Sequence, residues 1–208
     1  MSCGRSATAV QAATAAAINK AMNLPNKLTI LRIALVPVFI LFAILAQTSS
    51  SGHWYLIAGI VFAAASFTDW LDGYIARKKN IVTDFGKFAD PLADKILTTT
   101  ALLYMMAAGV CDPLVLCIIL AREFAVAGIR MVAAGAKNGK VIAANGWGKV
   151  KTVLQMLTIV FYYFGRAVSD AAVIGTITSV LCWVVAAVTL FSGVIYLHQN
   201  RRFIKNFK

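Results

Sequence analysis

Acidic side chains are scarce in this 208-residue chain. It holds 8 Asp and Glu against 20 Lys and Arg, which gives a net charge of +12, and only 13% of its residues are charged. Soluble domains usually carry about 25% charged residues. Because the chain is also 60% hydrophobic, with a mean hydropathy of +0.78, its composition argues against a soluble domain and indicates lipid as its solvent.

Cysteine is sparse as well, and no CxxC pair occurs. We interpret the four cysteines as small apolar packing residues: Cys3, Cys111, Cys117 and Cys182. The alternative is a disulfide between Cys111 and Cys117, near one outer end of the protein.

The N-terminal stretch lacks the run of Leu, Ile and Phe that a signal peptide needs, and it is rich in Ala. Met22 begins a second plausible start, MNLPNKLTILRI. We expect residues 1–22 to be a flexible or dispensable extension and residues 23–208 to form one membrane domain, with no internal repeat.

Hydrophobic runs of about 20 residues, the length that crosses a bilayer, recur along the chain. Their expected bounds are 28–46, 54–76, 84–108, 113–134, 147–164 and 171–197. Proline is rare, but Pro37 falls inside the first run and is expected to bend it. The sequence therefore predicts an all-α integral membrane protein, a bundle of six transmembrane helices.

Positive charge is distributed unevenly between the two ends of this bundle. The linkers 47–53, 109–113 and 165–170 contain only Arg166 of the 20 basic residues. By the positive-inside rule, both termini face the cytoplasm, as in a multi-pass protein of the cell (inner or plasma) membrane. Basic residues there would attract anionic headgroups, so membrane lipids are the expected partners and no nucleic acid is expected.

Five of the 8 acids fall in one segment, DWLDGYIARKKNIVTDFGKFADPLADK, at residues 69–95. Positions spaced i, i+3, i+4 and i+7 form one stripe of the second helix: Asp69, Asp72, Gly73 and Ala76. Positions spaced i, i+4 and i+8 form one stripe of the third: Gly86, Asp90 and Asp94. If the two helices pack side by side, four carboxylates converge on one cleft.

Four carboxylates so close together would repel one another, and divalent cations remove that repulsion. Oxygen-only ligands suit Mg²⁺ or Mn²⁺, and ionisable groups at membrane depth indicate a functional site because they are costly. Gly73 and Gly86 allow a substrate to approach closely, Ala76 keeps the next turn open, and the donor fork of Arg77 suits a phosphate. The segment predicts a metal site for phosphoryl chemistry.

Two positions also have a purely structural interpretation. Asp90 and Pro91 alone could be the cap and first residue of a helix. In register with Asp94, Pro91 would instead lie inside the third helix and kink it. Asp84 is expected to cap that helix and not to bind metal.

The motif order is Asp69-x2-Asp72-Gly73-x2-Ala76-Arg77-x8-Gly86-x3-Asp90-x3-Asp94. It resembles the signature of the CDP-alcohol phosphotransferases, membrane enzymes of phospholipid synthesis. The resemblance implies a six-helix membrane fold, often a homodimer, with two metal ions facing the cytoplasm. It implies that the metals are held by Asp69, Asp72, Asp90 and Asp94. Asp94 is also the implied catalytic base, and CDP-diacylglycerol is implied to contact Asp69, Gly73, Ala76, Arg77 and Gly86.

Basic side chains recur in the fourth and fifth helices. Arg122 and Arg130 are two turns apart on one face, while Lys149 and Lys151 open the fifth helix. We predict that these four cations bind a phosphate on the acceptor.

The alternative is that Arg122 pairs with Glu123 or a motif Asp and that the lysines extend to lipid headgroups. Thr29 and Arg32, near the start of the first helix, are further candidates for the pocket wall.

The segments NLPNKLTILRI, DPLADK, AREF…GIR and GKVKT narrow the resemblance to bacterial members that use sn-glycerol 3-phosphate. This implies transfer of the phosphatidyl group from CDP-diacylglycerol, giving phosphatidylglycerophosphate and CMP, with the lipid tails in a side opening between helices. Other acceptors are alternatives: phosphatidylglycerol (cardiolipin synthesis), inositol phosphate or serine. A cation transporter is the non-enzyme alternative, and Arg77 argues against it because it would repel a permeating cation.

Overall fold

The computed structural model describes the backbone of residues 24–49, 51–79, 84–135, 146–169 and 172–199. Side chains are described for 31–49, 51–68, 95–130, 146–169 and 172–199. The expected extension, residues 1–22, lies outside these ranges, as does Cys3.

Within the described ranges the chain is all-α and forms six long helices. They are α2 (Leu24–Ser49), α3 (Gly52–Lys79), α4 (Asp84–Ala107), α5 (Pro113–Gly135), α6 (Gly146–Val168) and α7 (Ala172–Gln199). Each overlaps one of the six apolar segments expected from sequence, with bounds that differ by up to four residues. Helix α2 continues through Pro37. Because α4 begins at Asp84 and runs on through Pro91, the alternative that Asp90 and Pro91 start a helix is wrong.

The connection between α4 and α5 shows how local sequence sets a helix boundary. Gly109 has a φ of 73°, a left-handed conformation that glycine adopts without strain. The N–H groups of Gly109 and Val110 donate to the carbonyls of Met106 and Met105, which closes α4 with a Schellman cap. Helix α5 then starts at Pro113, after Asp112, whose side-chain oxygen accepts a hydrogen bond from the Leu114 N–H at 2.7 Å.

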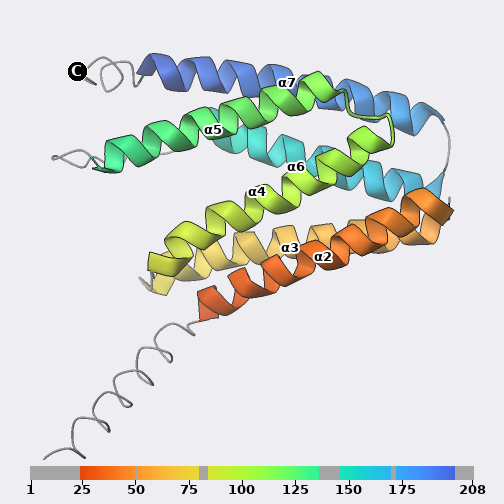
Figure 1. Ribbon diagram of the computed structural model, residues 1–208, viewed down its shortest axis with the longest axis horizontal. Helices are drawn as coiled ribbons and strands as arrows, with labels where there is room; N and C mark the ends of the chain where they lie inside the picture. Colours follow the sequence, from red (N-terminus) through yellow and green to blue (C-terminus); the bar gives the residue numbers. More distant parts are fainter. Residues whose placement is uncertain (1–23, 50, 80–83, 136–145, 170–171, 200–208) are drawn as a thin grey trace, which may run out of the picture.

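The helices form an up-and-down bundle (Figure 1). Helix α2 packs along α3, α3 on α6, α6 on α7 and α7 on α5, whereas α4 packs mainly on α2 and touches α3, α5 and α6 lightly. The short connections α2–α3, α4–α5 and α6–α7 lie at one end. The C-terminal end of α3, the N-terminal end of α4 and the outer ends of α2 and α7 lie at the other, where the sequence concentrates its positive charge.

Aromatic rings and small residues fill the interior between α2, α3 and α6. Phe39 is fully buried, and its ring centroid lies 5.4 Å from that of Tyr163 and 6.0 Å from that of Phe62. Alanines such as Ala58 and Ala65 are fully buried where helices approach closely. Cys111 and Cys182 are also buried, while Cys117 is exposed and all three are free. The packing interpretation therefore holds for the two buried cysteines, and the Cys111–Cys117 disulfide is wrong.

Apolar side chains also cover the outside of the bundle. Phe124 is 70% exposed, and Leu41 and Leu157 are more than half exposed. Two described stretches, Leu31–Ser49 and Ala172–Gln199, are long and apolar enough to cross a membrane, and shorter apolar stretches lie in α3 and α4. A surface this apolar is typical of a protein in contact with lipid.

Candidate active site

The motif positions occupy the adjoining ends of α3 and α4. Residues 69–77 lie in α3 and residues 86–94 in α4, so both stripes have the helical spacing expected from sequence. Five peptide steps join Lys79 to Asp84, which limits the separation of these helix ends to about 18 Å. The motif side chains lie outside the described ones, so their roles stay predictions.

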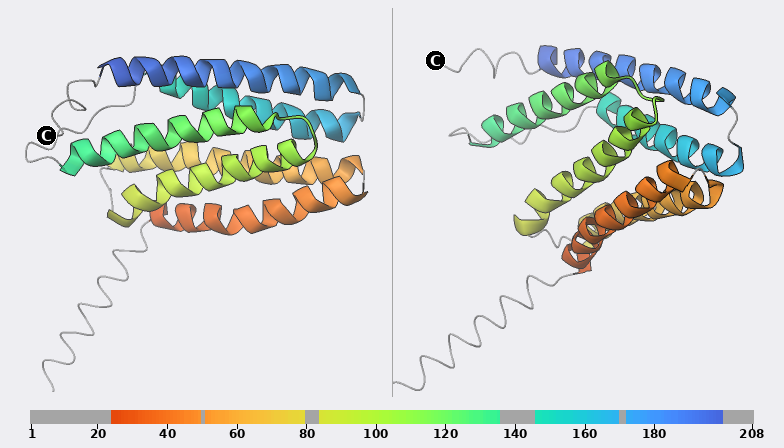
Figure 2. Two further views of the ribbon diagram at one scale, coloured as in Figure 1. Left: turned by 45° about the horizontal axis from the view of Figure 1, so that its top comes forward. Right: turned by 45° about the vertical axis from the view of Figure 1, so that its right-hand side comes forward.

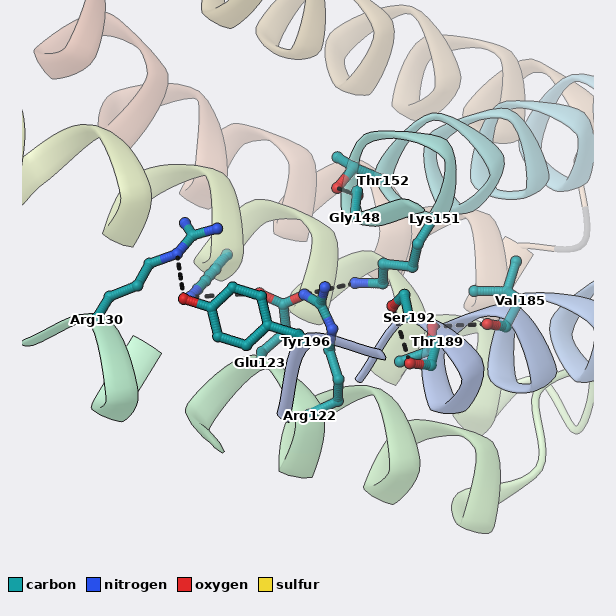
Figure 3. Close-up of polar contacts among 11 residues, drawn as sticks. Arg122, Glu123, Arg130, Gly148, Lys151, Thr152, Val185, Thr189, Ser192 and Tyr196 are labelled. Atoms are coloured by element: carbon teal, nitrogen blue, oxygen red, sulfur yellow. Dashed lines mark hydrogen bonds and ion pairs between the residues drawn. The ribbon is translucent and has the colours of Figure 1, made fainter. Parts of the chain in front are cut away.

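A second charged cluster is centred on Glu123 of α5 (Figure 3). Its Oε1 accepts from Lys151 Nζ at 2.7 Å and from Arg122 Nη1 at 3.1 Å. Its Oε2 lies 3.3 Å from Lys95 Nζ of α4. We call these four residues the Glu123 cluster. Three cations and one carboxylate leave it with a net charge of +2.

Chain connectivity places this cluster beside the motif. Lys95 directly follows Asp94, so their Cα atoms are about 3.8 Å apart. The ion pair between Lys95 and Glu123 therefore ties α5 and α6 to α4, one residue beyond the last motif position. Lys151 is almost fully buried there, with a side chain that is 4% exposed.

Arg122 lies in a narrow slot between α6 and α7. A Cβ atom added at Gly193 would be 3.0 Å from Arg122 Cγ, and one added at Gly148 would be 3.2 Å from Arg122 Nη2. Arg122 Nε is buried and has no hydrogen-bond partner among the described residues. Two glycines thus leave room for the guanidinium, which retains donors for a ligand.

The other two predicted acceptor residues lie apart from this cluster. Arg130 Nε is 3.4 Å from the Tyr196 hydroxyl, and its guanidinium carbon is 5.6 Å from the centroid of that ring. Lys149 is exposed and forms no ion pair with a described residue. The structure thus brings together Arg122 and Lys151 of the four cations. The Arg122–Glu123 pairing kept as an alternative is present, within a larger cluster.

The candidates on the first helix are only partly described. Arg32 is fully buried in α2, so it is an interior residue of the bundle. The side chain of Thr29 lies outside the described ones.

A cavity of about 390 Å³ adjoins the Glu123 cluster between α4, α5 and α6. Lys95, Glu123 and Lys151 lie on its wall, and the rest is mainly apolar or hydroxyl-bearing: Ile96, Thr98, Thr99, Thr100, Ile119, Leu120, Phe124, Thr152 and Gln155. Helices α4 and α5 meet at their connection and diverge from it (Figure 1 and the right-hand view of Figure 2), which leaves space for this cavity.

Sequence reasoning did not single out Lys95 or assign a role at the site to Glu123. A signal was present for the second, because Glu123 is the sole acid between residues 113 and 169 and the sole glutamate in the chain. An isolated acid in an apolar helix requires a partner. No such signal marked Lys95 as one of its partners, since the two residues are 28 positions apart in the sequence.

Comparison with known proteins covers most of the chain. The family model for CDP-alcohol phosphatidyltransferase matches residues 22–191. A protein of Bacillus subtilis (strain 168) named CDP-diacylglycerol–glycerol-3-phosphate 3-phosphatidyltransferase is 38% identical, covering 88% of this chain and 97% of the relative. Relatives of the same name are 35% identical in Rickettsia bellii (87% and 97% covered) and 34% identical in Haemophilus influenzae (84% and 91% covered).

The family match includes both motif helices and all members of the Glu123 cluster. Because the match spans most of the chain and the relatives are similar over nearly their full lengths, the chain belongs to the CDP-alcohol phosphatidyltransferase family.

Proposed function

We propose that this protein transfers the phosphatidyl group of CDP-diacylglycerol to sn-glycerol 3-phosphate, giving phosphatidylglycerophosphate and CMP. The reaction is that for which its relatives are named. The choice of acceptor rests on the Glu123 cluster. This cluster has a net charge of +2, and its member Lys95 directly follows Asp94. A phosphate monoester carries a charge of about −1.5 to −2 at neutral pH, which this cluster would balance.

The motif carboxylates are proposed to hold two divalent ions. Four oxygen-donor residues at helical spacing on adjoining helix ends fit Mg²⁺ or Mn²⁺. The residues that would hold the ions are Asp69, Asp72, Asp90 and Asp94. When bound, the ions would neutralise the donor pyrophosphate and the departing CMP.

The chain's own residues then orient the acceptor and move its proton. Arg122 and Lys151 hold the acceptor phosphate so that its 1-hydroxyl lies in line with the donor. Asp94 takes the hydroxyl proton as the oxygen bonds to the β-phosphorus. The bond from this phosphorus to the bridging oxygen breaks, and CMP leaves with that oxygen. Arg130 and Lys149 supply further positive charge at the approach to the site.

The donor is proposed to lie along the motif stripe of α3 and the start of α4. Its CDP part contacts the residues that resemble the family signature: Asp69, Gly73, Ala76, Arg77 and Gly86. Its acyl chains extend toward the cavity between α4, α5 and α6, whose wall is apolar beyond the charged cluster. The chains can thereby stay within the bilayer during transfer.

The arrangement in the membrane is also a proposal. All six helices cross the cell membrane with both termini and the motif on the cytoplasmic side, which agrees with the positive charge at that end. The exposed apolar side chains support lipid contact along the bundle. We further propose a homodimer, which cross-linking in native membranes tests.

The reaction is tested by measuring CMP release from purified protein supplied with CDP-diacylglycerol and Mg²⁺. Glycerol 3-phosphate, inositol phosphate, serine and phosphatidylglycerol are offered separately. Turnover with glycerol 3-phosphate alone is the expected result. Turnover with another alcohol only would retain the family chemistry and refute the assignment of the acceptor.

A further inference from the structure

We infer that Glu123 is a positioning residue, which together with Gly148 and Gly193 holds Arg122, Lys151 and Lys95 in one arrangement that receives the acceptor phosphate. The inference rests on the proposed function, because it concerns the site at which glycerol 3-phosphate is proposed to bind. It assigns roles to three residues that the motif does not include.

The first observation is that three cations from three helices meet at one carboxylate. Lys95 belongs to α4, Arg122 to α5 and Lys151 to α6, and each lies within 3.3 Å of a Glu123 oxygen. Like charges this close repel strongly in a protein interior. Helices α4, α5 and α6 make few other contacts with one another, so the carboxylate is a principal connection between them.

The second observation is that both carboxylate oxygens are occupied while Arg122 keeps a donor without a described partner. Oε1 accepts two hydrogen bonds and Oε2 faces Lys95. The Arg122 guanidinium has five N–H donors, and its bond from Nη1 to Glu123 leaves others available. The buried Nε of Arg122, which no described group accepts from, is one such donor.

The third observation is that two glycines shape the slot for Arg122. Gly148 lies against the end of the guanidinium and Gly193 against the aliphatic stem. In each case a methyl group would meet a flexible side chain and not backbone. Alanine at either position would therefore push the Arg122 side chain by a few tenths of an ångström.

The first test replaces the charge of Glu123. Glu123→Gln keeps the side-chain size but removes the charge that holds the three cations together. Because the cations then separate, the KM for glycerol 3-phosphate should rise about tenfold or more, the effect of losing one charged hydrogen bond. The KM for CDP-diacylglycerol should stay within about twofold of the wild-type value, because the donor is proposed to bind away from Glu123. Glu123→Asp, which restores the charge on a shorter side chain, should recover part of the loss.

The second test uses the glycines with matched controls. Gly148→Ala and Gly193→Ala should each raise the KM for glycerol 3-phosphate about three- to tenfold, because they shift Arg122 without removing it. Gly146→Ala in α6 and Gly175→Ala in α7 are the controls, since a Cβ at either position would have no described atom within 4 Å. The KM of each control for glycerol 3-phosphate should stay within about twofold of the wild-type value.

A binding measurement without turnover accompanies both tests. Glycerol 3-phosphate added without CDP-diacylglycerol should raise the melting temperature of the wild type in detergent. Glu123→Gln should melt at a lower temperature without ligand, because three cations lose their carboxylate, and it should also lose the shift produced by glycerol 3-phosphate. A Glu123→Gln protein that is less stable but keeps the shift produced by glycerol 3-phosphate, with the KM values of both substrates changed alike, would assign Glu123 a structural role only and overturn the inference.

Three further outcomes distinguish a failure of the inference from a failure of the proposed function. A lower KM in Glu123→Gln would mean that the carboxylate competes with the phosphate, which contradicts a positioning role. A wild type that turns over glycerol 3-phosphate, with Glu123→Gln, Gly148→Ala and Gly193→Ala unaffected, overturns the inference alone. A wild type without turnover on that acceptor overturns the proposed acceptor itself.

Discussion

Replacing Lys151 by Met tests the Glu123 cluster through its most buried member. The Lys151 side chain is 4% exposed, against 12% for Arg122 and 35% for Lys95, and its ammonium makes the shortest contact with Glu123, at 2.7 Å. Methionine has nearly the same length and no charge. The substitution therefore removes the charge-assisted hydrogen bond to Glu123 and leaves little empty space.

The cost in stability follows from what Glu123 retains. A hydrogen bond to a charged group contributes about 1.5–3 kcal/mol. Loss of the sole partner of a buried charge costs about 3–5 kcal/mol, but Glu123 keeps Arg122 at 3.1 Å and Lys95 at 3.3 Å. We therefore expect Lys151→Met to lower the free energy of unfolding by about 2 kcal/mol.

The effect on catalysis should be of similar size. If the ammonium also holds the acceptor phosphate, its loss removes a further charged contact of about 2 kcal/mol. At 1.36 kcal/mol per tenfold, kcat/KM for glycerol 3-phosphate should fall about 30-fold. The KM for CDP-diacylglycerol should change little, because the donor is proposed to lie on the motif helices.

Thermal unfolding in detergent and CMP release at varied glycerol 3-phosphate concentration measure the two effects. Lys149→Met is the matched control for stability, because Lys149 is exposed, lies two residues earlier in α6 and has no ion pair with a described residue. It should unfold within about 0.5 kcal/mol of the wild type. If Lys151→Met had the same melting temperature as Lys149→Met and kept the wild-type kcat/KM, the reasoning about the Glu123 cluster would be refuted.

Three other perturbations test separate parts of the molecule. Gly52→Ala would bring a Cβ to 2.6 Å from the Ala167 carbonyl oxygen, which is part of the backbone and cannot easily move. The substitution should therefore destabilise the protein by about 1–3 kcal/mol. A melting temperature at or above that of Gly175→Ala would contradict this. Asp94→Asn should lower kcat by about 10²-fold or more while Mn²⁺ still binds, measured by paramagnetic resonance; near-normal turnover with metal bound would exclude Asp94 as the base. A chain starting at Met22 should keep wild-type CMP release, because the family match begins there; lost activity in a correctly folded protein would show that the preceding residues take part.

Much of the fold could be predicted from sequence because the signals are local. Each helix coincides with an apolar run, and Gly109, Asp112 and Pro113 mark the α4–α5 connection through their own backbone preferences. The motif's spacing likewise predicted its helical stripes, since residues three and four apart are neighbours in any α-helix. The structure bears out these stripes in the backbone.

The acceptor side was harder to predict because its contacts join distant segments. Arg122 and Arg130 share a face of α5, yet one contacts Glu123 and the other Tyr196 of α7. Lys149 and Lys151 are two residues apart, about 200° around a helix, so the first is exposed and the second buried. Periodicity shows which residues share a face but not which helix that face meets.

The sequence by itself determined the helical class, the approximate bounds of the helices, the charge asymmetry between the two ends and the family signature, because each depends on residue type and short spacing. Only the tertiary structure decided which cations gather around Glu123, that Gly148 and Gly193 make room for Arg122, and that a cavity adjoins them. These features depend on how α4, α5, α6 and α7 pack. That packing is set by the sum of many weak contacts across the bundle and not by any one segment.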